Sequence, residues 1–220
     1  MSTIQRHPAA RALTSLGTAA ALAAAAALAL NMTAQAAGTA TVGQAAPAFT
    51  ATDTSGKTVS LSDFKGKHVV LEWVNPGCPF VVKHYSSQNM QLTQKDATGK
   101  GVVWLAINST APDARDYKAP AALALWMQQQ KAAATHTLMD ADGKVGRAYG
   151  ARTTPHMYIV NPVGTLVYAG AIDNKASVST ADVASATNHV KAALQETLAG
   201  KAVSIASTQP YGCSVKYSSM

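Results

Sequence analysis

The sequence predicts an α/β domain with a central mixed sheet and helices on both faces. Two apolar segments, 68–74 and 101–108, have the character of strands buried on both faces, and a helical segment, 79–95, lies between them. A strand, a helix and a strand in this order favour parallel pairing through a right-handed crossover. Farther along, the segment 156–171 contains two short apolar runs around a turn, which predicts a hairpin. Together these patterns predict a layered fold.

The remaining elements follow in chain order. Short strands are expected around Phe49 and Val59, on either side of the turn 53–57. Pro79 suits the first position of the helix after the first buried strand. The last helix carries an apolar stripe and is followed by Gly200, a residue common just past helix ends. The other expected elements are a helical turn at 62–64, helices at 121–131 and 180–198, a short strand at 136–140 and a helical turn at 143–149.

The N-terminus has the features of a secretory signal peptide. The first 36 residues carry Arg6 and Arg11 but no acidic residue, an apolar run covers 18–30, and Ala34-Gln35-Ala36 offers small residues for cleavage. The apolar run is shorter than the roughly 20 residues that cross a bilayer. We therefore expect a periplasmic or secreted protein that has no membrane attachment after signal cleavage.

We expect three parts: a signal peptide (1–36), one domain (37–201) and a C-terminal tail (202–220) that carries Cys213. The 184 residues after the signal peptide suffice for one domain with its own core. They include 16 basic and 11 acidic residues, a net charge of +5, and the basic residues are scattered. Scattered charge argues against nucleic-acid binding.

Cys78 is the predicted nucleophile. It lies directly between a buried strand and a helix, where unpaired N–H groups and the helix dipole favour the thiolate. Val81, Val82 and Tyr85 share its helical face, so desolvation opposes that effect and limits the acidification. The alternatives are an inert buried thiol and one half of a structural disulfide.

Cys213 is the only other cysteine, and it lies in a polar tail next to Gly212. As a resolving cysteine it would attack oxidised Cys78, within one chain or across a homodimer, and an external dithiol would then reduce the bond. The alternative is a permanent disulfide, since a bridge across 135 positions can contribute roughly 5 kcal/mol.

Three polar residues near Cys78 need separate interpretation. Glu72 is the one acid inside its apolar strand, and a buried carboxylate needs a partner or a raised pKa. The alternative for Glu72 is a strand-end carboxylate that reaches solvent or bonds to a backbone group. Lys83 and His84 follow the cysteine by five and six residues, which at about 100° per residue points them away from the thiol. We expect both on a solvated face.

Several motifs together carry a resemblance to a known family. They are Val42-Gly43-Gln44-Ala45-Ala46-Pro47-Ala48-Phe49, Leu61-Ser62-Asp63-Phe64-Lys65-Gly66-Lys67, the Cys78 segment, Tyr149-Gly150 with Thr154-Pro155-His156, and Pro210-Tyr211-Gly212-Cys213-Ser214-Val215-Lys216-Tyr217. Over about 42–217 the chain resembles thioredoxin-fold redoxins, in the peroxiredoxin-like branch related to alkyl hydroperoxide reductase and thiol-specific antioxidant proteins.

The resemblance implies a thioredoxin-like fold in which the thiol at the first helix faces a cis-proline. Thr154 and Pro155 match the cis-proline loop and, with Pro79 beside the thiol, are the expected substrate-binding residues. Glu72 stands six residues before Cys78, where thioredoxins keep a buried acid that assists proton transfer, so a catalytic role is implied. The implied activity is antioxidant: reduction of a peroxide or a protein disulfide, with an external dithiol as reductant.

The chain also departs from its relatives. Val81 stands where thioredoxins carry their second cysteine, which excludes a local dithiol. Asn75 and Leu71 stand where typical peroxiredoxins carry threonine and proline, and Arg152 lies near, but not at, the position of their catalytic arginine.

A binding protein without catalysis is the competing class. If His156 faced Cys78, the histidine and the two cysteines would form a soft site suited to copper, as in thioredoxin-fold copper carriers of the Sco type, alongside a structural disulfide. We expect no bound metal, and no organic cofactor motif is present.

Overall fold

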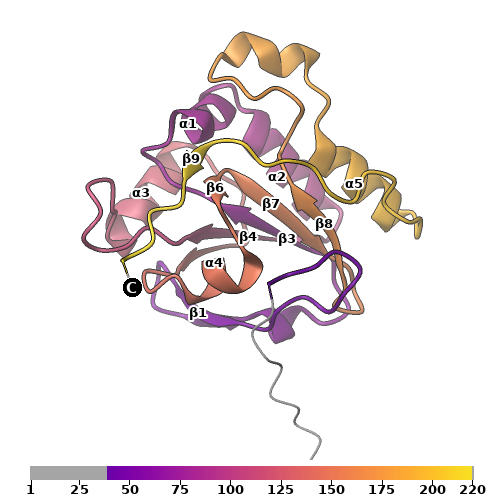
Figure 1. The fold of residues 1–220 in the computed structure, drawn as a ribbon, viewed down its shortest axis with the longest axis horizontal. Coiled ribbons are helices and arrows are strands. Elements are labelled where there is room, and N and C mark those ends of the chain that lie inside the picture. The colour runs from indigo at the N-terminus through magenta and orange to yellow at the C-terminus, as the bar shows by residue number, and fades with distance from the viewer. Residues whose placement is uncertain (1–38, 220) are drawn as a thin grey trace, which may run out of the picture. The chain divides into compact units, whose positions relative to one another are not determined.

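A seven-stranded mixed sheet runs through the centre of the fold, in the order β2-β1-β5-β4-β3-β7-β8 (Figure 1). The computed structural model describes residues 39–219, which belong to one compact unit; the predicted signal peptide lies outside the described residues. β3, β4 and β5 pair in parallel, whereas β1, β2, β7 and β8 join antiparallel. The strands are β1 (Thr50–Asp53), β2 (Thr58–Ser60), β3 (Val69–Trp73), β4 (Val103–Asn108), β5 (His136–Met139), β7 (His156–Val160) and β8 (Leu166–Gly170), with a separate pair, β6 (Thr153–Thr154) and β9 (Cys213–Ser214).

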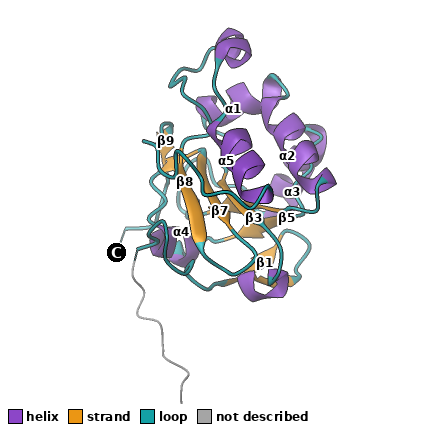
Figure 2. Cartoon of the chain, turned by 90° about the vertical axis from the view of Figure 1, so that its right-hand side faces the viewer, coloured by secondary structure: helices purple, strands orange, loops and turns teal. Residues whose placement is uncertain are grey.

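Helices cover both faces of this sheet, as expected from the sequence (Figure 2). One hydrophobic cluster lies under α1, α2, α3 and α5, and a second lies under α4. Along β3 the side chains alternate between them: Val70 faces the first cluster, and Leu71 and Trp73 face the second. The helices are α1 (Pro79–Ser86), α2 (Asn89–Gly99), α3 (Pro120–Gln129), α4 (Lys144–Tyr149) and α5 (His189–Leu198), with 3₁₀ turns at η1 (Leu61–Phe64) and η2 (Thr180–Ser185). The domain therefore has the layered α/β architecture that the sequence predicts.

The predicted hairpin is confirmed. β7 and β8 pair antiparallel, and the backbone N–H of Gly164 donates to the carbonyl of Asn161 at 2.9 Å, closing the turn. Gly164 has a φ of +87°, which glycine adopts without steric cost.

The single helix expected over 79–95 is wrong. α1 ends at Ser86 and α2 begins at Asn89, because Gln88 adopts a left-handed conformation with a φ of +62°. The break redirects the chain so that α2 packs against β4. No glycine or proline stands between residues 80 and 98 to signal the break in the sequence.

The single helix expected over 180–198 is also wrong. Only η2 and α5 are helical there, with an extended link between them. Asn188 begins α5, and its side chain accepts a hydrogen bond from the N–H of Lys191 at 2.9 Å. An asparagine N-cap of this kind satisfies one of the unpaired N–H groups at a helix start. Val183, which belongs to η2, therefore lies outside α5.

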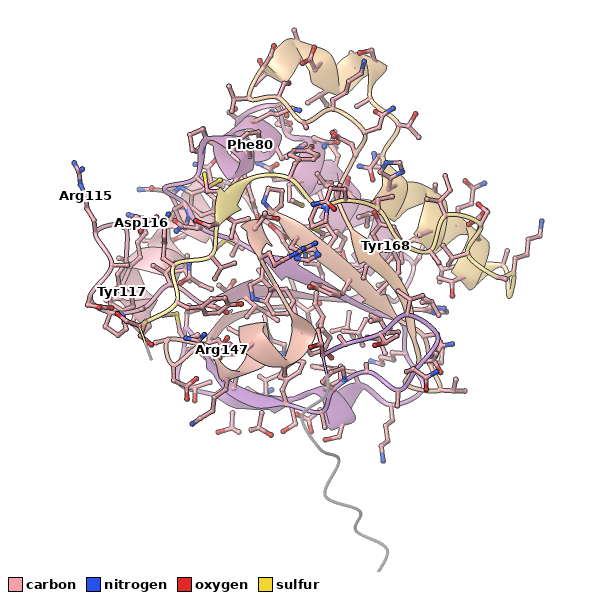
Figure 3. The ribbon with its side chains drawn as sticks, in the orientation of Figure 1. Phe80, Arg115, Asp116, Tyr117, Arg147 and Tyr168 are labelled. Carbon is pink, nitrogen blue, oxygen red and sulfur yellow. The ribbon has the colours of Figure 1, made fainter. Side chains whose placement is uncertain are left out.

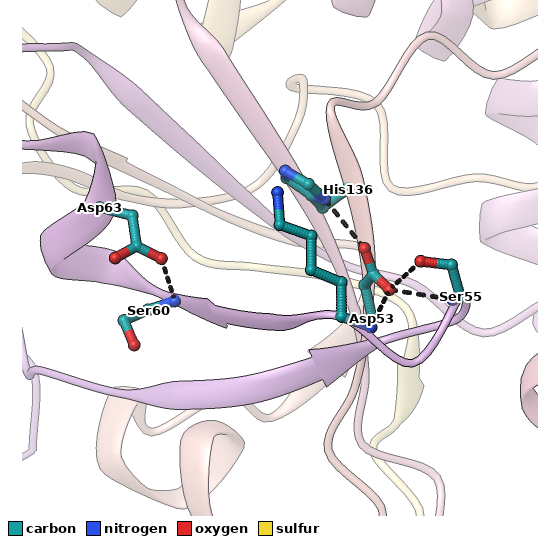
Figure 4. A network of polar contacts seen from close by, with 6 residues as sticks. Asp53, Ser55, Ser60, Asp63 and His136 are labelled. Atoms are coloured by element: carbon teal, nitrogen blue, oxygen red, sulfur yellow. Dashed lines mark hydrogen bonds and ion pairs between the residues drawn. The ribbon is translucent and has the colours of Figure 1, made fainter.

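The turn between β1 and β2 is held by Asp53 (Figure 4). Its carboxylate accepts hydrogen bonds from the Ser55 N–H at 2.9 Å, the Ser55 hydroxyl at 2.6 Å and the Lys57 N–H at 3.0 Å. His136, on β5, lies 3.1 Å from the other carboxylate oxygen. Burial opposes ionisation of Asp53, but these hydrogen bonds outweigh it and lower the pKa to about 2.

The C-terminal tail returns across the domain after α5 and passes β6 (Figure 1). Ala169 on β8 bonds to Ala206 and Thr208 through its backbone, and the Ala111 N–H donates to the Lys216 carbonyl at 2.7 Å. No helix within residues 39–219 is long and apolar enough to cross a membrane.

Candidate active site

The loop between β3 and α1 places Cys78 at the start of the helix. Cys78 is the N-cap of α1, with Pro79 as the first helical residue. Asn75 shapes the loop: its side-chain oxygen accepts from the Gly77 N–H at 2.7 Å, and its amide donates to Asp116 at 2.6 Å and to Thr110 at 3.2 Å. Sequence reasoning treated Asn75 only as a departure from a family pattern, although an Asx turn next to a glycine is a recognisable signal.

The Cys78 thiol points into the protein. It is only 1% exposed, and its Sγ donates to the carbonyl oxygen of Thr154 at 3.0 Å. The peptide bond between Thr154 and Pro155 is cis, as expected. The structure therefore brings together the cysteine and the two residues of the predicted substrate loop.

Cys213 lies against the same loop. In the β6–β9 pair it stands directly opposite Thr154, the residue whose carbonyl accepts from the Cys78 thiol, and it lies near enough for Cys78 to affect its pKa. Burial, followed by the hydrogen bond with Cys78 and the charge of that residue, raises the pKa of Cys213 to about 12. Both cysteines are free thiols in this structure.

Gly212 permits this close approach. Its φ is +139°, and a Cβ at this position would lie 2.1 Å from the Thr154 carbonyl oxygen. A residue with a side chain would therefore push β9 away from β6.

Glu72 is fully buried in β3, on the face toward α1 and α2. Its carboxylate accepts hydrogen bonds from the Trp104 indole at 2.7 Å, the Tyr85 hydroxyl at 2.8 Å and the Gln94 amide at 3.0 Å. Burial raises its pKa, and these donors act against the rise. Both alternatives from the sequence, solvent access and a backbone partner, are excluded because all three partners are side chains. Within residues 39–219, no hydrogen bond joins Glu72 to either cysteine.

The prediction that Lys83 and His84 lie on a solvated face is wrong. Lys83 is 1% exposed and His84 is 0% exposed. Both do point away from the thiol, but the chain around Asp173 and the tail residue Tyr211 covers that side of α1. Figure 3 shows Phe80, also on α1, beside the tail strand.

His156 does not face Cys78. Successive side chains of β7 alternate, so Met157 joins the cluster that contains Cys78, whereas His156 packs against Tyr158 on the α4 side. Burial, and then the charge of Arg152, lower the pKa of His156 to about 3. Within the described part of the chain, no group of three histidine, cysteine or acidic side chains could hold a metal. The copper site considered from the sequence is therefore not assembled.

The rim of the site is open near Pro79. Gly77 and Pro79 are exposed on either side of Cys78 in the chain, and they line a depression of about 480 Å³ together with Val82 and Val178. Asp116 packs over Gly77, while its neighbour Arg115 points out into solvent (Figure 3). The depression therefore borders the cysteine loop at Gly77 and Pro79.

A mixed sheet, a cysteine at the first helix and a cis-proline against its thiol define a thioredoxin-fold redoxin, a class of thiol-based oxidoreductases. The chain belongs to the AhpC/TSA family, which it matches over residues 42–169, more than half of its length. No curated protein matches it.

Two solved structures share the fold over most of their length. A hypothetical protein from Sinorhizobium meliloti 1021 is 25% identical with a TM-score of 0.70, and the match covers 83% of this chain and 98% of that one. An uncharacterized conserved protein from Geobacillus kaustophilus is 27% identical with a TM-score of 0.69, covering 82% and 94%.

Proposed function

We propose that this protein is an exported two-cysteine antioxidant oxidoreductase, in which Cys78 attacks the substrate and Cys213 resolves the product. The observation that carries the proposal is the position of Cys213, opposite Thr154, whose carbonyl accepts the hydrogen bond from the Cys78 thiol. The closeness of the two thiols within one chain favours resolution inside a monomer over resolution across a homodimer.

Two substrate classes fit the first step. The Cys78 thiolate displaces an alcohol or water from a peroxide and becomes a sulfenic acid, or it displaces one thiolate from a disulfide and forms a mixed disulfide. In the second step Cys213 attacks the Cys78 sulfur, forming the intrachain disulfide and releasing water or the second thiol. An external dithiol then reduces this disulfide and leaves as a disulfide itself.

The order of the two attacks follows from charge. The raised pKa keeps Cys213 protonated while Cys78 is reduced, because ionising both adjacent thiols would place two negative charges together. Once Cys78 is oxidised it carries no charge, so one cause of the raised pKa is removed. Cys213 then ionises more easily than before, at the step where its thiolate must attack the Cys78 sulfur.

The docked tail favours a small substrate. Cys78 is almost fully buried, and β9 occupies the edge of Thr154 that an extended polypeptide would use. A peroxide can approach from the side of Pro79, whereas a protein disulfide needs the tail to move. We assign Thr154, Pro155 and Pro79 to substrate binding because they border the Cys78 thiol.

Glu72 is proposed as a proton carrier during resolution. Full burial raises its pKa, as suits a group that takes up and releases a proton during a reaction. The Tyr85 hydroxyl donates to Glu72, and Tyr85 lies on α1, the helix that begins at Cys78.

Export is proposed from the N-terminal sequence, which would place the enzyme in the periplasm or outside the cell, with a dithiol partner in the same compartment. For turnover in that compartment, the cysteine pair must alternate between the dithiol and the disulfide and not remain a permanent disulfide.

The reduction potential of the Cys78–Cys213 pair tests the proposal. The protein without residues 1–36 is equilibrated in graded thiol buffers, alkylated and analysed by mass spectrometry. A value between about −120 and −270 mV, the range of redox catalysts, is expected. A value below about −300 mV would make the bond a structural staple, and the absence of any bond would remove Cys213 from the mechanism.

A further inference from the structure

A buried polar cluster connects the tail to α1, at a distance from the thiols themselves. Its members, here called the Tyr211 cluster, are Lys83, His84, Asp173 and Tyr211. The first three are buried, and Tyr211 is half-buried. Burying this many polar groups costs free energy unless each is paired, so the arrangement needs an explanation.

The Tyr211 hydroxyl is held from two sides. It donates to Asp173 Oδ1 at 2.5 Å and lies 3.2 Å from His84 Nε2. The Asn89 amide lies 2.9 Å from His84 Nδ1 and can only donate to it, which leaves the proton of the neutral ring on Nε2. Burial lowers the pKa of His84 to about 4, so the ring is neutral at pH 7 and donates to Tyr211.

The tyrosine ring is held as well. Lys83 Nζ lies 5.8 Å from the ring centroid and donates to the Lys175 carbonyl at 2.9 Å. The Phe80 ring packs against the Tyr211 ring, with the two ring centroids 5.7 Å apart. Asp173 also accepts from the Lys175 N–H at 2.9 Å, which fixes the carboxylate that Tyr211 binds.

The Tyr211 cluster holds the chain close to both cysteines. Phe80 follows Cys78 by two residues, and Tyr211 precedes Cys213 by two. Beyond Cys213, the Val215 N–H donates to the Arg152 carbonyl at 3.0 Å. The short segment that carries Cys213 is therefore held at both ends.

We propose that Tyr211 is a positioning residue that holds Cys213 within reach of Cys78, so that the intrachain disulfide forms faster and is more stable than a bond to any external thiol. This inference rests on the proposed function and adds the element that controls its second step. A group held in reacting geometry gains a high effective concentration, and even small displacements reduce it steeply.

The test uses the Tyr211→Phe protein without residues 1–36. The substitution keeps the ring contacts but removes both hydrogen bonds of the hydroxyl. The effective concentration of the pair is measured by equilibration with reduced and oxidised glutathione. We expect a fall of tenfold or more, which corresponds to about 1.4 kcal/mol, while Cys78 first reacts with the disulfide probe 5,5′-dithiobis(2-nitrobenzoate) at least as fast as in the unsubstituted protein.

Tyr217→Phe is the matched control. Tyr217 lies in the same tail, and its hydroxyl donates one hydrogen bond, to the Ala151 carbonyl at 2.8 Å, away from the cluster. We expect the effective concentration of the cysteine pair in this variant to stay within twofold of that in the unsubstituted protein. An equal fall in both variants would mean that any weakening of the tail lowers the effective concentration, and it would overturn the inference. A Tyr211→Phe protein whose effective concentration stays within twofold of the unsubstituted value would overturn it as well.

Asp173→Asn keeps the inference testable if Tyr211→Phe does not fold. It leaves an acceptor for the hydroxyl but removes the charge, so a smaller fall in the same direction is expected, and no fall would count against the inference. Failure of the proposed function gives a different result, because the unsubstituted protein would then form either no disulfide in glutathione or a disulfide too stable for glutathione to reduce. If that protein forms the bond and the Tyr211 variant forms it equally well, only the positioning role is lost.

Discussion

The carbonyl of Thr154 accepts the hydrogen bond from the Cys78 thiol, and the same residue pairs with Cys213 across the β6–β9 ladder. One residue thus holds the two thiols together, although they lie 135 positions apart in the chain.

Replacing each cysteine separates the two chemical steps. Cys78→Ser should lose all peroxide- and disulfide-reducing turnover. Cys213→Ser should complete one attack and then stop, so that turnover with a dithiol reductant falls roughly tenfold or more while the oxidised Cys78 adduct accumulates. Trapping with dimedone after peroxide treatment, followed by mass spectrometry, checks this. Full turnover by Cys78→Ser would refute the assignment.

Glu72→Gln should change how stability depends on pH. The pKa of Glu72 is raised in the folded state, so the native protein keeps this proton at a pH where the unfolded chain, with a pKa near 4.5, has lost it. The unfolding free energy gained from this residue is therefore lost as pH rises from 4.5 through the folded pKa. The difference between the two proteins in urea midpoint, measured across this range, should show that slope.

The same variant tests the proton-carrier role. Glu72→Gln should slow the release of the second chromophore from 5,5′-dithiobis(2-nitrobenzoate), the step at which Cys213 resolves the mixed disulfide, without slowing the release of the first. Equal slopes of stability against pH in the Glu72→Gln and unsubstituted proteins would show that burial does not perturb the carboxylate. An unchanged rate of release of the second chromophore would remove Glu72 from the mechanism.

Gly212→Ala should loosen the tail. The new Cβ would collide with the Thr154 carbonyl, so β9 must separate from β6 and expose the Cys78 thiol. We expect the alkylation of Cys78 by iodoacetamide to become several times faster. Gly200→Ala is the control, because Gly200 also has a positive φ, +71°, but a Cβ there meets nothing within 4 Å. Unchanged alkylation in the Gly212 variant would show that β9 does not cover the thiol.

Asp53→Asn should destabilise the β1–β2 turn at neutral pH by about 1 to 2 kcal/mol, since hydrogen bonds to a charged acceptor are stronger than those to an amide. The folded pKa is about 2 and the usual value is 3.8, so the stabilisation is complete above 3.8 and is lost as pH falls toward 2. Urea unfolding at pH 7 and pH 2 checks this. Asp63→Asn, at an exposed carboxylate with one backbone partner (Figure 4), should cost less.

The sequence predicts the sheet well because its signals are local. The apolar runs that become β3 and β4 need no knowledge of their neighbours, and the turn at 161–164 is defined by its own asparagine and glycine. The position of Cys78 at a strand-to-helix junction is local too.

The errors concern contacts between distant segments. Helical geometry correctly turns Lys83 and His84 away from the thiol, but it does not reveal that Asp173 and Tyr211 return to cover them. The face of the sheet on which His156 lies depends on a strand register that only the assembled sheet defines. The left-handed Gln88 likewise reflects the packing of α2 rather than any preference of glutamine.

The acceptor that the Cys78 thiol uses at Thr154 is part of the main chain, so no side-chain replacement removes it. The threonine hydroxyl itself is buried and has no hydrogen-bond partner within the described residues. Valine, which has nearly the same shape, should therefore serve at this position, and a Thr154→Val protein should form its disulfide at the original rate. Sequence drift at residue 154 is thus compatible with an intact thiol pair, and a search for related enzymes should not demand threonine there.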